Sequence, residues 1–126
     1  MKKLLTGLIA VAVGLVAAPA FSAMETVTGT VVDQNCYTKD KANNLGVDHK
    51  MPADVTACAV ACAKKGQPLA LVTKDGKMHT IAGGLAANNN AKLVPHVGHT
   101  VSITGDVVAK GNSSTITSSE LKMVSK

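Results

Sequence analysis

Three cysteines and four histidines are the residues of this 126-residue chain whose types and spacing could do chemistry. Cys58 and Cys62 are four residues apart in the segment ACAVACAKKG, and Cys36 lies upstream of them. If that segment is helical, Cys58 and Cys62 lie on one face, one turn apart. Thiolate sulfur and imidazole nitrogen together form a donor set that suits copper or zinc. The spacing therefore predicts a soft-metal site built from Cys36, Cys58 and Cys62.

The histidines differ in how well they are placed to complete such a site. His49 is the predicted fourth ligand, because it lies in the loop between Cys36 and the cysteine helix, although a solvated loop residue fits that position equally well. His96 and His99 precede a predicted strand, so they either order that loop or join the metal only if the fold brings them near. His79 lies within an alternating strand, where a surface or hydrogen-bonded role is expected.

The same cysteines also allow a disulfide in place of a metal. A bond between Cys58 and Cys62 has poor geometry, because Cα atoms one helical turn apart are near the outer limit for a disulfide. A bond from Cys36 to either of them would pin the helix to the first strand and stabilise the fold by roughly 3 kcal/mol. The third cysteine would then be a buried thiol. Redox-active thiols are a further alternative, and the sequence leaves all three open.

The first residues, MKKLLTGLIAVAVGLVAAPAFSA, have the layout of a secretory signal peptide. Two lysines precede an uncharged apolar run that is shorter than the roughly 20 residues needed to cross a bilayer, and small residues follow it. We therefore expect residues 1–23 to be a cleaved leader and residues 24–126 to form one domain, periplasmic or secreted and without a membrane anchor. Disulfides form and persist in such a compartment.

Composition and motifs argue against two classes of function. The formal net charge is +5, but the basic residues are scattered, and one Tyr, one Phe and no Trp give no stacking platform for nucleic acid. The chain has no glycine-rich phosphate loop, no G-x-S-x-G and no C-x-x-C. The sequence thus favours binding over catalysis, with an unnamed periplasmic protein or a metal ion as the partner.

Short strands and one helix account for most of the remaining pattern. Pro52, Asp54 and the pair Lys64-Lys65 are typical of helix ends, and Gly66 supplies a stop. The Asp75-Gly76 pair between two alternating runs is a strong hairpin signal. Polar residues 38–51 are expected to be a loop, and residues 85–95 a loop with at most one or two helical turns. The predicted helix spans 52–65, and the predicted strands span 26–33, 68–73, 78–82, 100–108 and 114–123.

This element order is mainly β and fits a five-stranded OB-like small barrel with one α-helix, at about 52–65, inserted after the first strand. An open five-stranded sandwich is the alternative. The segments VTGTVVDQNCY, CAVACAKKGQPLALVTKDGKMHTI and HVGHTVSITGDVV also resemble small exported bacterial proteins of unknown function with an OB-like barrel. That resemblance implies fold and export, and it implies no activity. The expected function is soft-metal binding through Cys36, His49, Cys58 and Cys62, or else a disulfide-stabilised interaction module without metal.

Overall fold

The computed structural model describes residues 22–44 and 51–126. The expected leader lies outside these residues except for Ser22 and Ala23, which begin the first strand. His49 also lies outside them. Within the described residues no helix has the length and apolar character needed to cross a membrane.

Six strands and six short helical segments follow one another in the described residues. In chain order they are β1 (Ser22–Asp33), α1 (Gln34–Lys39), η1 (Ala42–Asn44), α2 (Ala53–Lys64), β2 (Leu69–Val72), β3 (Met78–Ala82), η2 (Gly83–Ala86), α3 (Ala87–Asn90), η3 (Val94–His96), β4 (Thr100–Lys110), β5 (Ser113–Thr117) and β6 (Leu121–Ser125).

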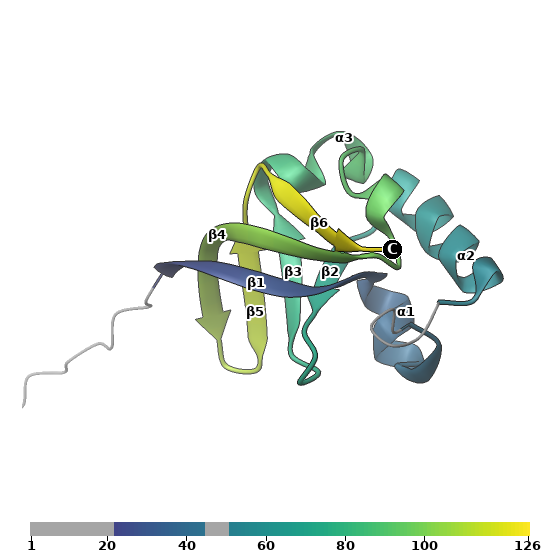
Figure 1. Cartoon of the computed structure of the whole chain (residues 1–126), viewed down its shortest axis with the longest axis horizontal. Helices are drawn as coiled ribbons and strands as arrows, with labels where there is room; N and C mark the ends of the chain where they lie inside the picture. Colours follow the sequence, from purple (N-terminus) through teal and green to yellow (C-terminus); the bar gives the residue numbers. More distant parts are fainter. Residues whose placement is uncertain (1–21, 45–50) are drawn as a thin grey trace, which may run out of the picture.

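Five of these strands close a barrel in the order β1-β2-β3-β5-β4, because β4 also pairs with β1 (Figure 1). The β3–β5 pair is parallel, and the other pairs are antiparallel. The expectation of a mainly β, OB-like five-stranded barrel with a helix after the first strand is therefore confirmed. The open sandwich is excluded by the β1–β4 pairing.

Glycines lie where the long strands change partners. Gly29 in β1 directly precedes Thr30, which pairs with β4 on one edge and with β2 on the other. A Cβ atom on Gly29 would overlap the carbonyl oxygen of Val72. Gly105 in β4 lies where the partner on one edge changes from β6 to β5, and its Cβ would overlap the carbonyl oxygen of Thr117. Both crossings therefore require a residue without a side chain.

The prediction of one closing strand over residues 114–123 was wrong in its extent. The chain forms two strands there, β5 and β6, separated by residues 118–120. Ser118 makes the break, since its Oγ donates to the carbonyl of Thr104 at 2.7 Å and accepts from the backbone N–H of Glu120 at 3.3 Å. As a result β6 leaves β5 and pairs with the other half of β4, outside the five-stranded barrel.

Most of the remaining expectations match the structure, and two segments differ. The helix expected at 52–65 is α2, and the β2–β3 hairpin turns at Asp75-Gly76. Residues 85–95, expected to be a loop with at most one or two helical turns, contain or overlap three short helical segments, η2, α3 and η3. The predicted loop at 38–51 is partly helical, because α1 extends to Lys39 and η1 follows it. Its start was hidden in the apparent strand end, where Asp33 caps α1.

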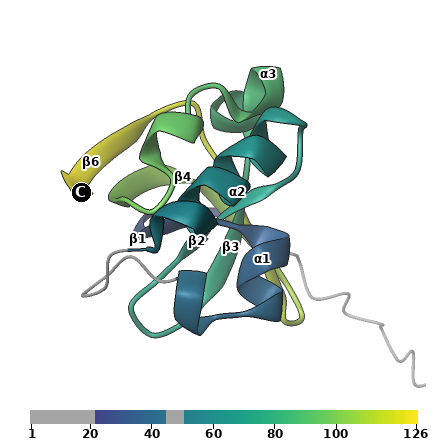
Figure 2. The same ribbon diagram turned by 90° about the vertical axis from the view of Figure 1, so that its right-hand side faces the viewer.

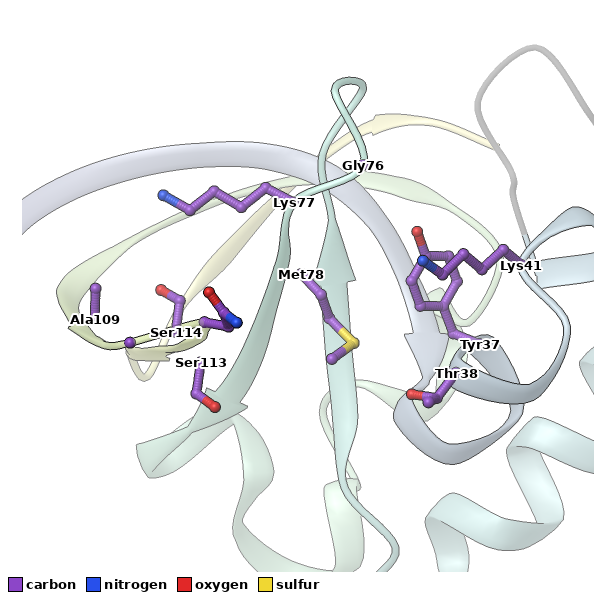
Figure 3. A pocket seen from close by; sticks show the side chains of 11 residues that line it. Tyr37, Thr38, Lys41, Gly76, Lys77, Met78, Ala109, Ser113 and Ser114 are labelled. Carbon is purple, nitrogen blue, oxygen red and sulfur yellow. The ribbon is translucent and has the colours of Figure 1, made fainter.

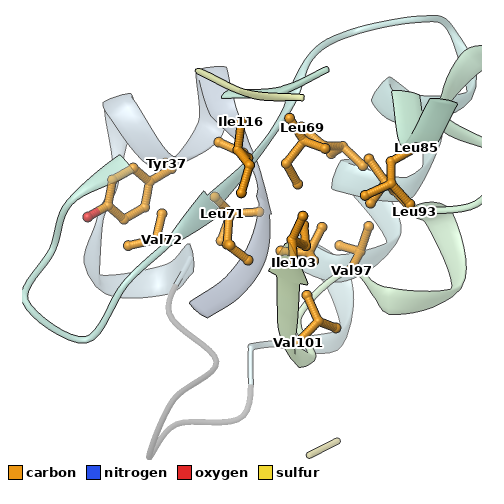
Figure 4. Close-up of a cluster of buried hydrophobic side chains, with 14 of the residues drawn as sticks. Tyr37, Leu69, Leu71, Val72, Leu85, Leu93, Val97, Val101, Ile103 and Ile116 are labelled. Carbon is orange, nitrogen blue, oxygen red and sulfur yellow. The ribbon is translucent and has the colours of Figure 1, made fainter. Parts of the chain in front are cut away.

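The core fills the barrel with aliphatic side chains, and Tyr37 is its one aromatic member among the described residues (Figure 4). Leu69, Leu71, Ile103 and Ile116 are fully buried between the strands. The helical segments gather at one end of the barrel, with α2 lying across it and α1 beside it (Figure 2). This end of the molecule carries all three cysteines as well as His96 and His99.

Candidate functional site

Cys36 is positioned by the short helix α1, which follows β1 without a loop. Asp33 is the N-cap of α1, and its Oδ1 accepts from the backbone N–H of Cys36 at 2.8 Å. At the other end of α1, the carbonyl of Cys36 accepts from the N–H of Asp40 at 2.9 Å and from Nδ2 of Asn44 at 3.3 Å. An N-cap carboxylate typically contributes about 1 kcal/mol to such a helix. The backbone of Cys36 is thus held on both sides.

Cys58 and Cys62 are positioned by α2, whose C-terminal end is closed by a Schellman motif. Gly66 has φ +87°, its N–H donates to the carbonyl of Ala63, and the N–H of Gln67 donates to the carbonyl of Cys62. Asn90 is buried, and its Nδ2 donates to the carbonyls of Ala63 and Gln67, both at 2.9 Å. The glycine stop expected from sequence is therefore confirmed, and α3 secures it through Asn90.

Two hydrogen bonds join α1 to the segment that follows α2. The backbone N–H of Gln34 donates to the carbonyl of Pro68 at 3.2 Å, and Nδ2 of Asn35 donates to Oε1 of Gln67 at 3.2 Å. Since Gln34 and Asn35 directly precede Cys36, these bonds hold the thiol of Cys36 near the cysteine face of α2.

The three cysteines are free thiols that act on one another electrostatically. Burial raises the pKa of Cys36 to about 11, and the charges of Asp33, Cys58 and Cys62 contribute to the rise. Partial burial also raises the pKa of Cys62, with Asp33 and Cys58 adding to it. We call Cys36, Cys58, Cys62 and the carboxylate of Asp33 the thiol cluster. Sequence reasoning identified its three cysteines but missed Asp33, for which the signal was an N-cap residue three positions before Cys36.

Asp33 is the most deeply buried member of the thiol cluster, at 1 % exposed. Its Oδ2 is buried and has no hydrogen-bond partner among the described residues. An ionised carboxylate in that position disfavours neighbouring thiolates and would be stabilised by a nearby cation. This carboxylate adds to the effect of burial in raising the pKa values of Cys36 and Cys62, which favours their protonated forms.

Among residues 22–44 and 51–126, no three His, Cys, Asp or Glu side chains are already arranged to hold a metal ion. The thiols of the cluster would have to turn toward one ion. The predicted fourth ligand, His49, lies outside the described residues.

The other three histidines lie in two places: His79 is in β3, and His96 and His99 are together in the turn before β4. His79 in β3 is buried, and its Nδ1 lies 2.7 Å from Oγ of Ser114 in β5. Burial lowers the pKa of His79, and Lys77 lowers it further. His96 and His99 form an edge-to-face pair with ring centroids 6.1 Å apart, and Gly98 between them lies close to Met51 and to Thr56 in the first turn of α2. His79 is thus the hydrogen-bonded strand residue that its position predicted.

A pocket of about 380 Å³ opens between α1, the β2–β3 hairpin and the β4–β5 turn (Figure 3). Lys41, Lys77, Met78 and Ser114 line it, and Nζ of Lys41 lies 5.9 Å from the ring centroid of Tyr37. Its lining has ammonium and hydroxyl groups but no carboxylate. Sequence reasoning missed this pocket, because its walls come from a helix and two turns that are far apart in the chain.

Asp33→Asn is expected to speed up alkylation of Cys36 in the metal-free protein. At about pH 8, a pKa of about 11 leaves the thiolate of Cys36 more than about 100 times scarcer than that of an ordinary cysteine. Asparagine keeps the Oδ1 cap but removes the charge, so the pKa of Cys36 falls and its alkylation rate rises at least about threefold. Burial, the larger cause, remains. Rates are measured by peptide mass spectrometry between about pH 7 and 10.

The matched control for this measurement is Asp54→Asn, which removes an exposed carboxylate from the first turn of α2. It should leave the alkylation rate of Cys36 unchanged. Equal rates for Asp33→Asn and the unaltered protein would show that the carboxylate of Asp33 does not act on the thiol.

Comparisons of the chain with models of protein families, with curated proteins and with solved structures gave no significant match. The resemblance to small exported OB-like proteins therefore stays an expectation drawn from motifs.

Proposed function

We propose that this protein is an exported metal-binding protein that takes up a soft metal ion, copper or zinc, through the thiols of Cys36, Cys58 and Cys62. One observation carries the proposal: hydrogen bonds from Gln34 and Asn35 hold α1, which carries Cys36, against the end of α2, which carries Cys58 and Cys62, and a buried oxygen of Asp33 has no hydrogen-bond partner among the described residues. His49 stays the predicted fourth ligand.

The donor set fits a soft cation better than it fits a hard one. Three sulfur atoms are the preferred ligands of Cu(I) and are common ligands of Zn(II), whereas Mg²⁺ and Ca²⁺ take oxygen ligands. Asp33 supplies a negative charge that a cation would neutralise. Metal binding requires thiolates, so it releases protons from Cys36 and Cys62, whose raised pKa values keep them protonated beforehand. Metal affinity is therefore expected to increase with pH.

The thiol cluster also fits the alternative function, a disulfide-stabilised interaction module. The bonds from Gln34 and Asn35 that bring Cys36 toward α2 serve a disulfide to that helix equally well. A structural disulfide and a three-thiolate site exclude each other, because a disulfide consumes two of the thiols. The number of free thiols in the native protein therefore separates the two functions.

The test is the native intact mass of the purified full chain, measured with and without reductant, chelator and a thiol-alkylating reagent. The expected result is an added mass of one metal ion that the chelator removes, with all three thiols becoming alkylatable only after its removal. A chain lighter by two hydrogens, with one alkylatable thiol and no metal, would overturn the proposal and establish the disulfide. Three thiols that react freely without any metal would overturn both functions.

A further inference from the structure

His96 and His99 present two imidazole nitrogens that lack partners. The Nδ1 atom of each ring is buried, and no described residue forms a hydrogen bond with either. A buried polar atom left unpaired is destabilising, and here two such atoms belong to rings 6.1 Å apart at an interplanar angle of 75°. The rings themselves are only half-buried, so the pair can be reached from solvent.

A thioether lies beside the glycine of this turn. Met51 is 9 % exposed and packs against Gly98. Gly98 lies between the two histidines and directly precedes His99. A Cβ atom on Gly98 would lie 3.7 Å from Sδ of Met51. A side chain at Gly98 would therefore stand in contact with the sulfur, and glycine leaves that space free. Gly98 also has φ +80°, a conformation that favours glycine.

The backbone fixes both histidines before any ligand binds. The N–H of His99 donates to the carbonyl of His96 at 2.9 Å, and the N–H of His96 donates to the carbonyl of Leu93 at 2.8 Å. The turn is tied to β1, because Gly98 donates to the carbonyl of Val31 at 2.8 Å and Val31 donates to the carbonyl of His99 at 3.1 Å. The two rings thus project from a short, anchored turn whose geometry costs little to organise on binding.

The ring separation is within the reach of two imidazoles on one metal ion, once each ring turns a nitrogen toward that ion. A ligating nitrogen lies about 2 Å from the metal and about 1.1 Å from its ring centre, so two rings on one ion have centroids at most about 6.3 Å apart. The observed 6.1 Å is close to that limit. Such an arrangement suits an ion of low coordination number, whereas structural Zn(II) requires four ligands, and the described residues provide no group of three His, Cys, Asp or Glu.

We propose that His96, His99 and the thioether of Met51 form a binding site for Cu(I), separate from the thiol cluster and independent of it. The two imidazoles supply the nitrogen donors, and the sulfur of Met51 supplies the soft donor that favours Cu(I) over zinc. This site goes beyond the proposed function, since it uses none of the three cysteines and would exist even if they formed a disulfide.

The test uses the full chain with Cys36, Cys58 and Cys62 replaced by serine, which removes every thiol. Cu(I) is titrated into this protein under anaerobic, reducing conditions. The imidazole nitrogens of His96 and His99 and the terminal methyl group of Met51 are followed by NMR. The expected result is that all three shift together and saturate at one equivalent. His79 serves as the internal reference, because Ser114 already bonds its Nδ1, and its resonances should not move.

Variants assign the ligands. His96→Asn and His99→Asn are each expected to weaken Cu(I) binding by at least about tenfold, because each removes one of two nitrogen donors. Met51→Leu keeps the volume of the side chain and should weaken Cu(I) binding several-fold while leaving the amide spectrum of the free protein unchanged. Lys92→Gln, on the exposed surface before the turn, is the matched control and should bind as the parent does.

Absence of any shift at His96 and His99 in the folded thiol-free protein would overturn this site. Shifts confined to His79, or affinity unaffected by both histidine substitutions, would overturn it too. This titration tests the histidine site separately from the thiol cluster, because the protein titrated has no thiols. A failure of the native-mass test therefore leaves this proposal standing, and the reverse also holds.

Discussion

Gly105→Ala is expected to destabilise the protein by at least about 3 kcal/mol, at the upper end of what overpacking costs. A Cβ atom at this position would overlap the carbonyl oxygen of Thr117 and would lie 2.9 Å from the Cβ of Ser118. The obstacle is backbone, so it cannot turn aside as a flexible side chain would. The β4–β5 pairing next to the crossing must therefore open. For a domain of this size the melting temperature should fall by more than about 12 °C.

Gly76→Ala is the control for this prediction. Gly76 lies in the β2–β3 turn with φ +85°, and nothing lies within 4 Å of a Cβ placed on it. Alanine there should lower the stability by only about 1–2 kcal/mol, the cost of the left-handed backbone conformation. Thermal unfolding followed by circular dichroism compares the two variants. Equal losses of stability would show that β4 can shift away from Thr117 and that Gly105 is needed only for local conformation.

Cys62→Ser is expected to reduce the affinity for Cu(I) at the thiol cluster by at least about 100-fold, the change that follows from losing one soft ligand of three. Serine is close to cysteine in size but its hydroxyl is a poor ligand for a soft ion. Cys62 is half-buried on α2, and its carbonyl, which accepts from the N–H of Gln67, is unaffected by the substitution. Affinity is measured by competition with a chromophoric Cu(I) chelator in a His96→Asn/His99→Asn background, so that the histidine pair does not contribute.

Ala61→Ser in the same background introduces a hydroxyl at an exposed position of the same helix and should leave Cu(I) affinity unchanged. An affinity of Cys62→Ser equal to that of the control would remove Cys62 from the ligand set. A loss of Cu(I) affinity in Cys36→Ser but not in Cys62→Ser would place the ion between Cys36 on α1 and Cys58 on α2.

The barrel could be predicted because its signals are local. Valine and threonine alternate in the first strand, Asp75-Gly76 marks the hairpin, and Gly66 ends the helix, and each of these does in the structure what its chemistry favours. The split of the last strand could not be predicted in the same way. Ser118 ends β5 through a hydrogen bond to Thr104, a residue whose proximity depends on the closed barrel.

The candidate site likewise has parts that local spacing predicts and parts that depend on tertiary structure. The i, i+4 spacing of Cys58 and Cys62 places them on one face of α2 from sequence alone. The approach of Cys36 depends on a six-residue helix capped by Asp33, which looked like part of a strand and a polar loop. The two histidines are visible in the sequence as H-V-G-H, but the approach of Met51 to Gly98 is a tertiary contact that no spacing indicates.

The long pairing of β1 with β4 has a consequence for the order in which the chain can fold. Thr26 faces Thr104 and Thr28 faces Ser102, so the first strand finds this partner only after some 75 residues of intervening chain. Closing so large a loop is entropically costly and slow. A nascent chain that ends before β4 has α2 and the β2–β3 hairpin but no barrel to support them. The hydrogen bonds that hold α1 against the end of α2 all lie before residue 69, so the three thiols can meet before the barrel beneath them closes.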